Sequence, residues 1–192
     1  MIVKNLKKIL FPIFSLFLAY RSIELMKILI GSNPDEFSQI EAIIISFLLT
    51  LFITGVFAFI GFAYPSSRLL SYAYYEVKNP KALNSLYKLL GIKYFRALLL
   101  FIFWGRKNNR KKYFNGTKRG LNNFIFQTKQ SEFGHLGAFI ITIISSIILF
   151  ANGYVFIVII ITFINFIGNL YPIVLQRSHR IRIEKITKYN NI

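Results

Sequence analysis

The chain has 192 residues, of which 55% are hydrophobic and 17% aromatic but only 16% charged. A soluble domain of this length has too little interior to bury so many apolar side chains, so the composition predicts an all-α integral membrane protein. The 24 Lys and Arg outnumber seven Asp and Glu, and because no nucleic-acid-binding motif accompanies this charge, we expect anionic lipid and not nucleic acid beside it.

Two stretches in the first third of the chain predict membrane spans, each of which needs about 20 mostly apolar residues. Residues 42–63 contain no charge. Residues 9–30 follow a basic start, as in a signal peptide, but no small-x-small cleavage site follows, so we expect an uncleaved span. Within it Arg21 and Glu24 can pair at i, i+3 while Lys27 reaches outward, and a functional polar cluster is the alternative.

Residues 65–132 predict a cytoplasmic region at the membrane surface. Asn79 is a candidate N-cap and Pro80 a candidate first helical residue. An apolar face then repeats at helical spacing, at Leu83, Leu86, Tyr87, Leu90 and Tyr94. We expect one interfacial amphipathic helix that ends at Trp104, followed by a basic loop at residues 105–120.

The last third of the chain predicts two further spans, residues 134–150 and 154–175, joined by the short turn "ANG". So short a connection makes them an antiparallel helical hairpin. A basic tail, residues 176–192, follows. The chain is therefore expected to form one membrane domain, residues 1–192, with four transmembrane helices and an interfacial amphipathic helix.

The basic residues predict the orientation of these spans. Fourteen Lys or Arg lie in residues 64–132 and five follow Leu175, whereas the loop at 31–41 carries only acidic charge. By the positive-inside rule, the basic segments stay on the cytoplasmic side. We expect a multi-pass protein of the bacterial cell membrane with both termini in the cytoplasm.

Polar residues form one stripe on each helix of the hairpin. The stripe of the third helix, which begins before the span itself, comprises Thr128, Glu132, His135, Thr142 and Ser146. The stripe of the fourth comprises Thr162, Asn165, Asn169, Pro172, Gln176 and Arg180. Because the helices are antiparallel and buried amides avoid hydrocarbon, the stripes should face each other, which places Glu132 and His135 near "QRSHRIR", residues 176–182.

These residue types permit catalysis at the cytoplasmic boundary. His135 could remove a proton from a hydroxyl as general base, with Glu132 orienting its ring. Arg177, Arg180 and Arg182 could bind a phosphate-bearing donor. The alternatives are that Glu132 only stabilises a helix N-terminus, that His135 is satisfied at an interface, and that the arginines only determine topology.

Neither a metal nor a cofactor is expected. Glu132, His135 and His179 could offer three ligands, but their spacing is not diagnostic of a metal site. The absence of cysteine excludes disulfides, thiolate metal sites and cysteine nucleophiles. The sequence also contains neither a Gly-rich phosphate loop nor a Gly-x-Ser-x-Gly elbow.

The segment "QTKQSEFGHLGAF", the apolar hairpin and "NLYPIVLQRSHRIRI" together resemble a family of small membrane proteins, the glycosyl-diaponeurosporenoate acyltransferases. These enzymes esterify a glycosylated carotenoid acid in carotenoid biosynthesis. The family pattern Thr-x-x-Ser/Ala-Glu-x-x-His corresponds to residues 128–135. Its later positions correspond to Asn169, Gln176, Arg177, Arg180 and Arg182, and "LYKLLGIKYFRALL" resembles the middle region, so the likeness covers roughly residues 74–184.

The resemblance implies an acyltransferase that uses acyl-CoA or acyl carrier protein as donor and a lipid or glycolipid hydroxyl as acceptor. It implies His135 and Glu132 as catalytic residues. The substrate-binding residues that it implies are Thr128, Asn169, Gln176, Arg177, Arg180 and Arg182. One departure concerns the binding pocket, because Ser178 and His179 replace Tyr-Asn between the arginines.

Two other function classes fit the same features. A non-enzymatic membrane subunit or anionic-lipid-binding protein would use the stripes only to hold two helices together. A small transporter is less favoured, because four spans without an internal repeat make a poor alternating-access unit.

Overall fold

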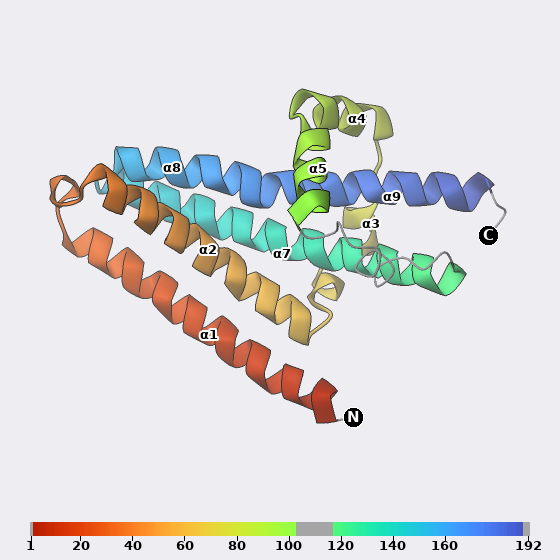
Figure 1. Cartoon of the computed structure of the whole chain (residues 1–192), viewed down its shortest axis with the longest axis horizontal. Helices are drawn as coiled ribbons and strands as arrows, with labels where there is room; N and C mark the ends of the chain where they lie inside the picture. Colours follow the sequence, from red (N-terminus) through yellow and green to blue (C-terminus); the bar gives the residue numbers. More distant parts are fainter. Residues whose placement is uncertain (1, 103–116, 190–192) are drawn as a thin grey trace. The chain divides into compact units, whose positions relative to one another are not determined.

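A computed structural model describes residues 2–102 and 117–189, and every regular element in these ranges is helical, as predicted. The helices are α1 (Ile2–Gly31), α2 (Gln39–Ala63), α3 (Tyr72–Tyr75), α4 (Pro80–Leu89), α5 (Ile92–Ile102), α7 (Lys118–Ala151), α8 (Val155–Asn165) and α9 (Tyr171–Tyr189) (Figure 1). The 3-10 turns η1 (Pro34–Glu36) and η2 (Ser66–Leu69) and the π-helical turn η3 (Phe166–Leu170) complete the set.

Four helical stretches of the described residues are long and apolar enough to cross a membrane. They are Leu6–Gly31, Gln39–Ala63, Gly120–Ala151 and Val155–Lys185. The number and order of the predicted spans are confirmed. The third helix begins well before residue 134. The fourth runs from α8 through η3 into α9 and continues beyond residue 175.

The contacts divide the chain into two compact units. The first unit comprises Met1–Ser66 and Gly134–Leu170, and the second comprises Ser67–Phe133 and Tyr171–Ile192. Both α7 and the fourth span therefore contribute residues to each unit. The single membrane domain over residues 1–192 stays a prediction.

In the first unit, α1 and α2 run side by side in opposite directions (Figure 1). The Ser15 hydroxyl donates to the Val56 main-chain carbonyl over 3.0 Å, a contact that small side chains permit. At the start of α2, Ser38 and Glu41 form a reciprocal capping box, which satisfies two free N–H groups. The expected pair of Arg21 with Glu24 is confirmed, and Lys27 is exposed.

The α7–α8 hairpin of the first unit closes in a three-residue turn. Gly153 has φ +85°, a conformation that glycine adopts without steric penalty, so the predicted turn is confirmed. The Tyr154 hydroxyl donates to the main-chain carbonyls of Leu29 and Ser32. These bonds tie the hairpin to the end of α1, above a core that includes Leu29, Leu49, Leu149 and Ile161.

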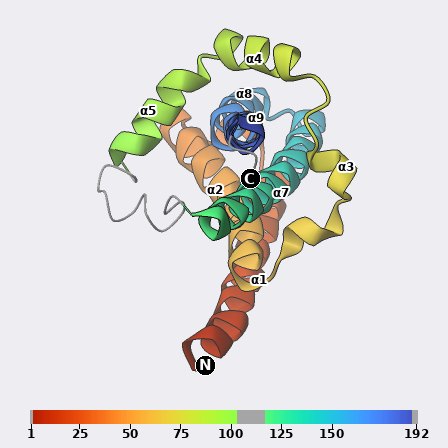
Figure 2. The same ribbon diagram turned by 90° about the vertical axis from the view of Figure 1, so that its right-hand side faces the viewer.

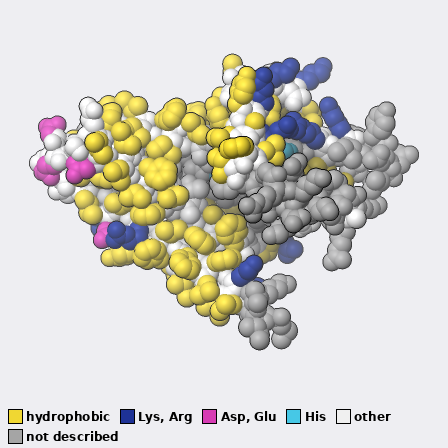
Figure 3. All heavy atoms as spheres, viewed as in Figure 1, with side chains coloured by type: hydrophobic (Ala, Val, Ile, Leu, Met, Phe, Trp, Pro, Cys, Tyr) yellow, Lys and Arg dark blue, Asp and Glu magenta, His cyan; other side chains and the backbone are white. Residues whose placement is uncertain are grey.

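Much of the apolar side-chain surface of the first unit is exposed. In Figure 3 hydrophobic side chains cover most of the visible surface of α1 and α2, and acidic side chains gather where these helices join. Those acidic residues are Asp35, Glu36 and Glu41, whereas Lys7 and Lys8 lie near the other end of α1. An apolar belt between opposite charges is the surface of a membrane-spanning unit.

In the second unit, α4 and α5 curve around α9 (Figure 2). Asn79 caps α4 by accepting a hydrogen bond from the Ala82 main-chain N–H over 3.0 Å, and Pro80 is the first helical residue, as predicted. The two helices break at Gly91, which has φ +62°. The Gly91 N–H donates to the Lys88 carbonyl over 3.0 Å, so this glycine ends α4.

The expected single amphipathic helix is therefore two helices, because a left-handed glycine stops the first of them. The apolar face is also divided. Leu83, Tyr87 and Leu90 pack towards a core of Ile92, Val174 and Leu175. Leu86 and Tyr94 are exposed, as are Leu89 and Phe101. The predicted endpoint Trp104 and most of the basic loop at 105–120 lie outside the described residues.

Candidate active site

The polar stripes of the hairpin form two clusters, one in each unit. The histidine cluster, in the first unit, comprises Thr54, His135, Asn165, Asn169 and the Phe139 main-chain carbonyl. The arginine cluster, in the second unit, comprises Tyr74, Tyr75, Glu132, Arg177 and Arg180. In each unit a stripe residue of α7 contacts a stripe residue of the fourth span, His135 with Asn169 and Glu132 with Arg180, so the predicted facing is confirmed at these positions. Thr162, by contrast, is exposed.

The histidine cluster holds an imidazole against a carboxamide. The Nδ1 atom of His135 lies 3.0 Å from Oδ1 of Asn169. The Nδ2 group of Asn169 donates to Oδ1 of Asn165 over 2.9 Å and to the Thr54 hydroxyl over 3.2 Å. Asn165 in turn donates from Nδ2 to the Phe139 carbonyl over 3.2 Å. Both amides are buried, and the nitrogen and the oxygen of each have at least one partner, which offsets the cost of placing them among apolar side chains.

The π-helical turn η3 positions Asn169. Five residues of the fourth span leave the α-helical pattern at this point, and Asn169 is the one that is fully buried. Pro172, in the first turn of α9, has no N–H to donate to the carbonyl four residues earlier, which favours such an irregularity. Single π-turns inside longer helices occur frequently at functional sites.

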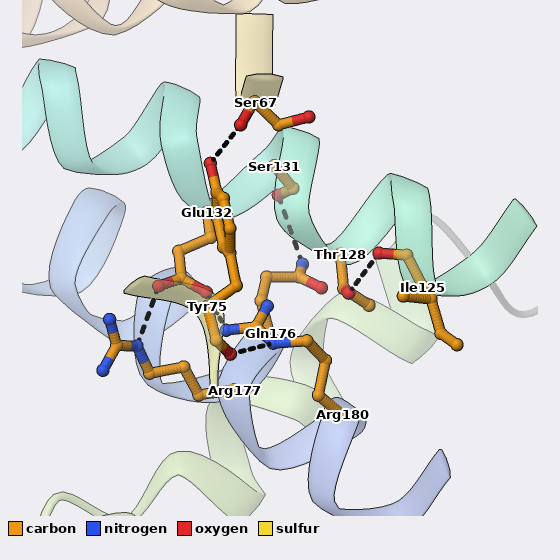
Figure 4. A network of polar contacts seen from close by, with 9 residues as sticks. All are labelled: Ser67, Tyr75, Ile125, Thr128, Ser131, Glu132, Gln176, Arg177 and Arg180. Carbon is orange, nitrogen blue, oxygen red and sulfur yellow. Dashed lines mark hydrogen bonds and ion pairs between the residues drawn. The ribbon is translucent and has the colours of Figure 1, made fainter. Parts of the chain in front are cut away.

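The arginine cluster is built around Glu132, whose side chain is fully buried. One carboxylate oxygen accepts from Nε of Arg177 over 2.8 Å, and the other pairs with Nη2 of Arg180 (Figure 4). Arg180 also donates from Nε to the Tyr75 main-chain carbonyl over 3.1 Å. The predicted approach of Glu132 to residues 176–182 is thereby confirmed for two of the three arginines.

Aromatic rings of α3 cover these guanidinium groups. The guanidinium carbon of Arg177 lies 5.0 Å from the centre of the Tyr74 ring, and that of Arg180 lies 5.7 Å from the centre of the Tyr75 ring. The Tyr75 hydroxyl donates to the Ser67 carbonyl over 2.9 Å. Burial, with a contribution from the Glu132 charge, raises the pKa of Tyr75 to about 12, so this phenol stays protonated at neutral pH.

The charges of the arginine cluster do not cancel. One carboxylate faces two guanidinium groups, which leaves one net positive charge. Among the described residues the Nη1 group of Arg180 is buried and has no hydrogen-bond partner. Arg177 is more open, with a side-chain exposure of 29% against 5% for Arg180. The cluster can therefore attract an anion through Arg177 while Arg180 stays buried.

The other predicted site residues have local roles. Gln176 donates to the Ser131 hydroxyl over 3.2 Å. The Thr128 hydroxyl is buried and donates to the Ile125 carbonyl of its own helix over 2.7 Å. Arg182 is exposed on α9, and His179 packs against the Phe124 ring. Within residues 2–102 and 117–189, no three His, Asp or Glu side chains gather as metal ligands.

Sequence reasoning missed two kinds of partner. Thr54 lies in α2, far from the hairpin in sequence, and its hydroxyl is one of several in an apolar span. Tyr75 contributes its main-chain carbonyl, and because every residue has one, the sequence cannot indicate this contact. The aromatic run "YAYY" of α3 is nevertheless uncommon in a segment that connects two membrane spans.

Comparison with known proteins assigns the family. The model of the family described as glycosyl-4,4'-diaponeurosporenoate acyltransferase (CrtO) matches residues 71–189, which contain His135, Glu132 and the three arginines. Searches of curated proteins and of solved structures find no significant match. The matched region is more than half of the chain, and it includes both polar stripes. The chain belongs to the glycosyl-4,4'-diaponeurosporenoate acyltransferase family.

Proposed function

We propose that the protein transfers a fatty acyl group from an acyl-CoA or acyl-carrier-protein thioester to a hydroxyl of a glycosylated carotenoid or related isoprenoid lipid. One observation carries this proposal: the region matched by the acyltransferase family contains a histidine whose Nδ1 atom is held by the amide oxygen of Asn169. An imidazole anchored at Nδ1 can use Nε2 for proton transfer.

The proposed reaction uses His135 as general base. Its Nε2 atom takes the proton of the acceptor hydroxyl while the oxygen attacks the thioester carbonyl carbon. The tetrahedral intermediate then expels the thiolate, which takes the proton back from Nε2. The products are an ester and a free thiol, and His135 is regenerated.

Glu132 has a different task in this proposal from the one its spacing first indicated. Both of its carboxylate oxygens are engaged by Arg177 and Arg180. A buried carboxylate in this position holds two guanidinium groups in place and offsets part of their charge. We therefore assign Glu132 to anchoring the arginine cluster.

The remaining residues would bind the substrates. Arg177 is the accessible guanidinium and suits a phosphate of the donor, while exposed Arg182 suits a lipid headgroup. Gln176 would contact the acceptor sugar. The hydroxyl of Thr128 is already bonded to its own helix, so we assign this residue to shaping α7 near the site.

The proposed location is the bacterial cell membrane, with both termini in the cytoplasm. The charge distribution of the first unit supports it, because Lys7 and Lys8 lie at the opposite end of α1 from Asp35 and Glu36.

The test compares lipid and pigment extracts by mass spectrometry from four strains: intact gene, deletion, His135→Ala and His179→Gln. His179→Gln is a matched control because it changes the chain's other histidine. We expect one acylated lipid to disappear in the deletion strain and to fall by about 10²–10⁴-fold in His135→Ala, at normal protein abundance. It should persist in His179→Gln. Retention of every acylated lipid in the deletion strain would overturn the proposal.

A second candidate function is a non-enzymatic subunit that binds anionic lipid. The observation that favours it is the exposed apolar surface of α4 and α5 beside basic residues such as Lys88 and Lys93. In that case the deletion would leave the acylated lipids unchanged, and the protein would still bind vesicles that contain anionic lipid.

A further inference from the structure

We propose that Asn165 and Asn169 form a directional hydrogen-bond relay that fixes His135 in the tautomer with its proton on Nδ1, which leaves Nε2 unprotonated in the neutral ring. The effect of this relay on activity rests on the proposed function, whereas the tautomer itself does not.

The direction of the relay is set at the Phe139 main-chain carbonyl. A carbonyl oxygen only accepts hydrogen bonds, so the atom of Asn165 that lies 3.2 Å from it must be the donor Nδ2. The Asn165 amide cannot turn over without placing two acceptors against each other in a buried site. Its Oδ1 atom therefore points to Asn169.

Asn169 transmits the same direction. The Oδ1 atom of Asn165 only accepts, so Asn169 must present Nδ2 to it, over 2.9 Å. That choice leaves Oδ1 of Asn169 facing Nδ1 of His135 over 3.0 Å. Because this oxygen also only accepts, Nδ1 of His135 must carry the proton.

Thr54 accommodates the relay without determining its direction. Its hydroxyl lies 3.2 Å from Nδ2 and 3.4 Å from Oδ1 of Asn169, and a hydroxyl can either donate or accept. Directional information therefore reaches the ring from the main chain of α7 through two carboxamides, and the Gly168 main chain is a further hydrogen-bond partner of the same ring. Both amides are buried, with exposures of 2% for Asn165 and zero for Asn169, so water does not replace these bonds.

Asn165 is thus a positioning residue, which acts on the imidazole through Asn169. The sequence placed it in the stripe, but its spacing gives no sign that it controls a histidine tautomer. Without Asn165, Asn169 could turn over and present Nδ2 to the ring, with Thr54 still satisfied. The imidazole would then adopt the other tautomer, in which Nε2 carries the proton and cannot act as base.

The first experiment measures the tautomer in the full-length protein reconstituted in lipid bilayers. The chain has two histidines, so His179→Gln leaves a single imidazole for solid-state NMR with ¹⁵N- and ¹³C-labelled histidine. We expect one set of neutral-ring signals, with a proton on the nitrogen bonded to Cγ and none on the nitrogen bonded to Cδ2. A ring that carries its proton on Nε2, or an even mixture of the two tautomers, overturns the relay. No variant of the relay residues is needed for this test.

The second experiment tests Asn165 in the same background. Asn165→Ala should add a second set of ring signals from the Nε2–H tautomer. Thr142→Val is the matched control, because Thr142 is buried in α7 and its hydroxyl has no partner among the described residues. This control should keep a single set of ring signals, from the Nδ1–H tautomer. An unchanged single Nδ1–H tautomer in Asn165→Ala, at normal membrane abundance, removes Asn165 from the relay.

Activity then separates the relay from the proposed function. If both hold, kcat of Asn165→Ala falls by the same factor as the Nδ1–H population, with KM unchanged. If the NMR result is as expected but acylation does not depend on His135, the relay stands and the proposed function fails. If acylation depends on His135 but the parent ring carries its proton on Nε2, the function stands and the relay fails.

Discussion

The histidine cluster and the arginine cluster each contain one fully buried polar side chain, held by different chemistry. Asn169 and Glu132 are both fully buried. Asn169 bonds to an imidazole, an amide and a hydroxyl, whereas Glu132 pairs with two guanidinium groups. In the uncharged cluster the arrangement of donors and acceptors determines how each side chain is oriented. In the charged cluster the attraction between opposite charges strengthens each hydrogen bond. We therefore expect changes in the charged cluster to affect stability most, and changes in the uncharged cluster to affect activity most.

The largest loss of stability is expected for Glu132→Gln. This change leaves the buried guanidinium of Arg180 without its counter-charge, which should lower the free energy of unfolding by about 3–5 kcal/mol. The free energy of unfolding is measured by adding increasing dodecyl sulfate to the purified protein in mixed micelles. The control is Glu184→Gln, whose side chain is exposed on α9. A double variant, Glu132→Leu with Arg180→Met, should recover part of the loss, and equal losses in Glu132→Gln and the control would contradict the comparison.

A smaller loss of stability is expected for Asn169→Ala. Removing its bonds to Asn165 and Thr54 should cost about 1–2 kcal/mol, because neutral hydrogen bonds inside membrane proteins contribute modestly. Acylation should nevertheless fall by more than tenfold, since His135 loses the group that fixes its ring. The same unfolding assay and the lipid extract measure the two effects, with exposed Asn123→Ala as control. A stability loss as large as that of Glu132→Gln would remove the distinction between the clusters.

The smallest effect is expected for Tyr75→Phe, which removes the hydroxyl bond to the Ser67 carbonyl and should cost about 1 kcal/mol at neutral pH. This variant also tests the pH dependence. The pKa of Tyr75 is raised to about 12 in the folded protein, from 10.0 for an ordinary tyrosine. Its contribution to stability is therefore complete below pH 10 and declines as the pH rises towards 12. The difference between the parent and Tyr75→Phe should shrink over this interval, and a difference that stays constant would refute the shifted pKa.

Much of the architecture could be predicted from the sequence because it depends on local pattern. The four spans follow from runs of apolar residues, and the bonds of Glu132 to Arg177 and Arg180 follow from helical periodicity combined with an antiparallel turn. The cap at Asn79 follows from its side chain and the proline after it.

The rest depends on features that residue spacing does not encode. The break at Gly91 depends on a left-handed backbone, and an isolated glycine in a helical pattern is equally compatible with a continuous helix. The pairing of His135 with Asn169 depends on the π-turn, which shifts the fourth span against a regular helix. Helical periodicity placed Glu132 correctly beside the arginines. It also suggested Glu132 as the partner of the His135 imidazole, because a periodicity argument assumes a regular α-helix throughout both spans.

The tight α7–α8 turn has a consequence for biosynthesis. Only three residues, one of them a left-handed glycine, separate Ala151 from Val155, so the adjoining ends of the two helices stay close together. We expect the two helices to enter the translocon and partition into lipid together, as one preformed insertion unit. In the proposed orientation the uncharged turn is translocated, and the basic ends stay on the side of the ribosome.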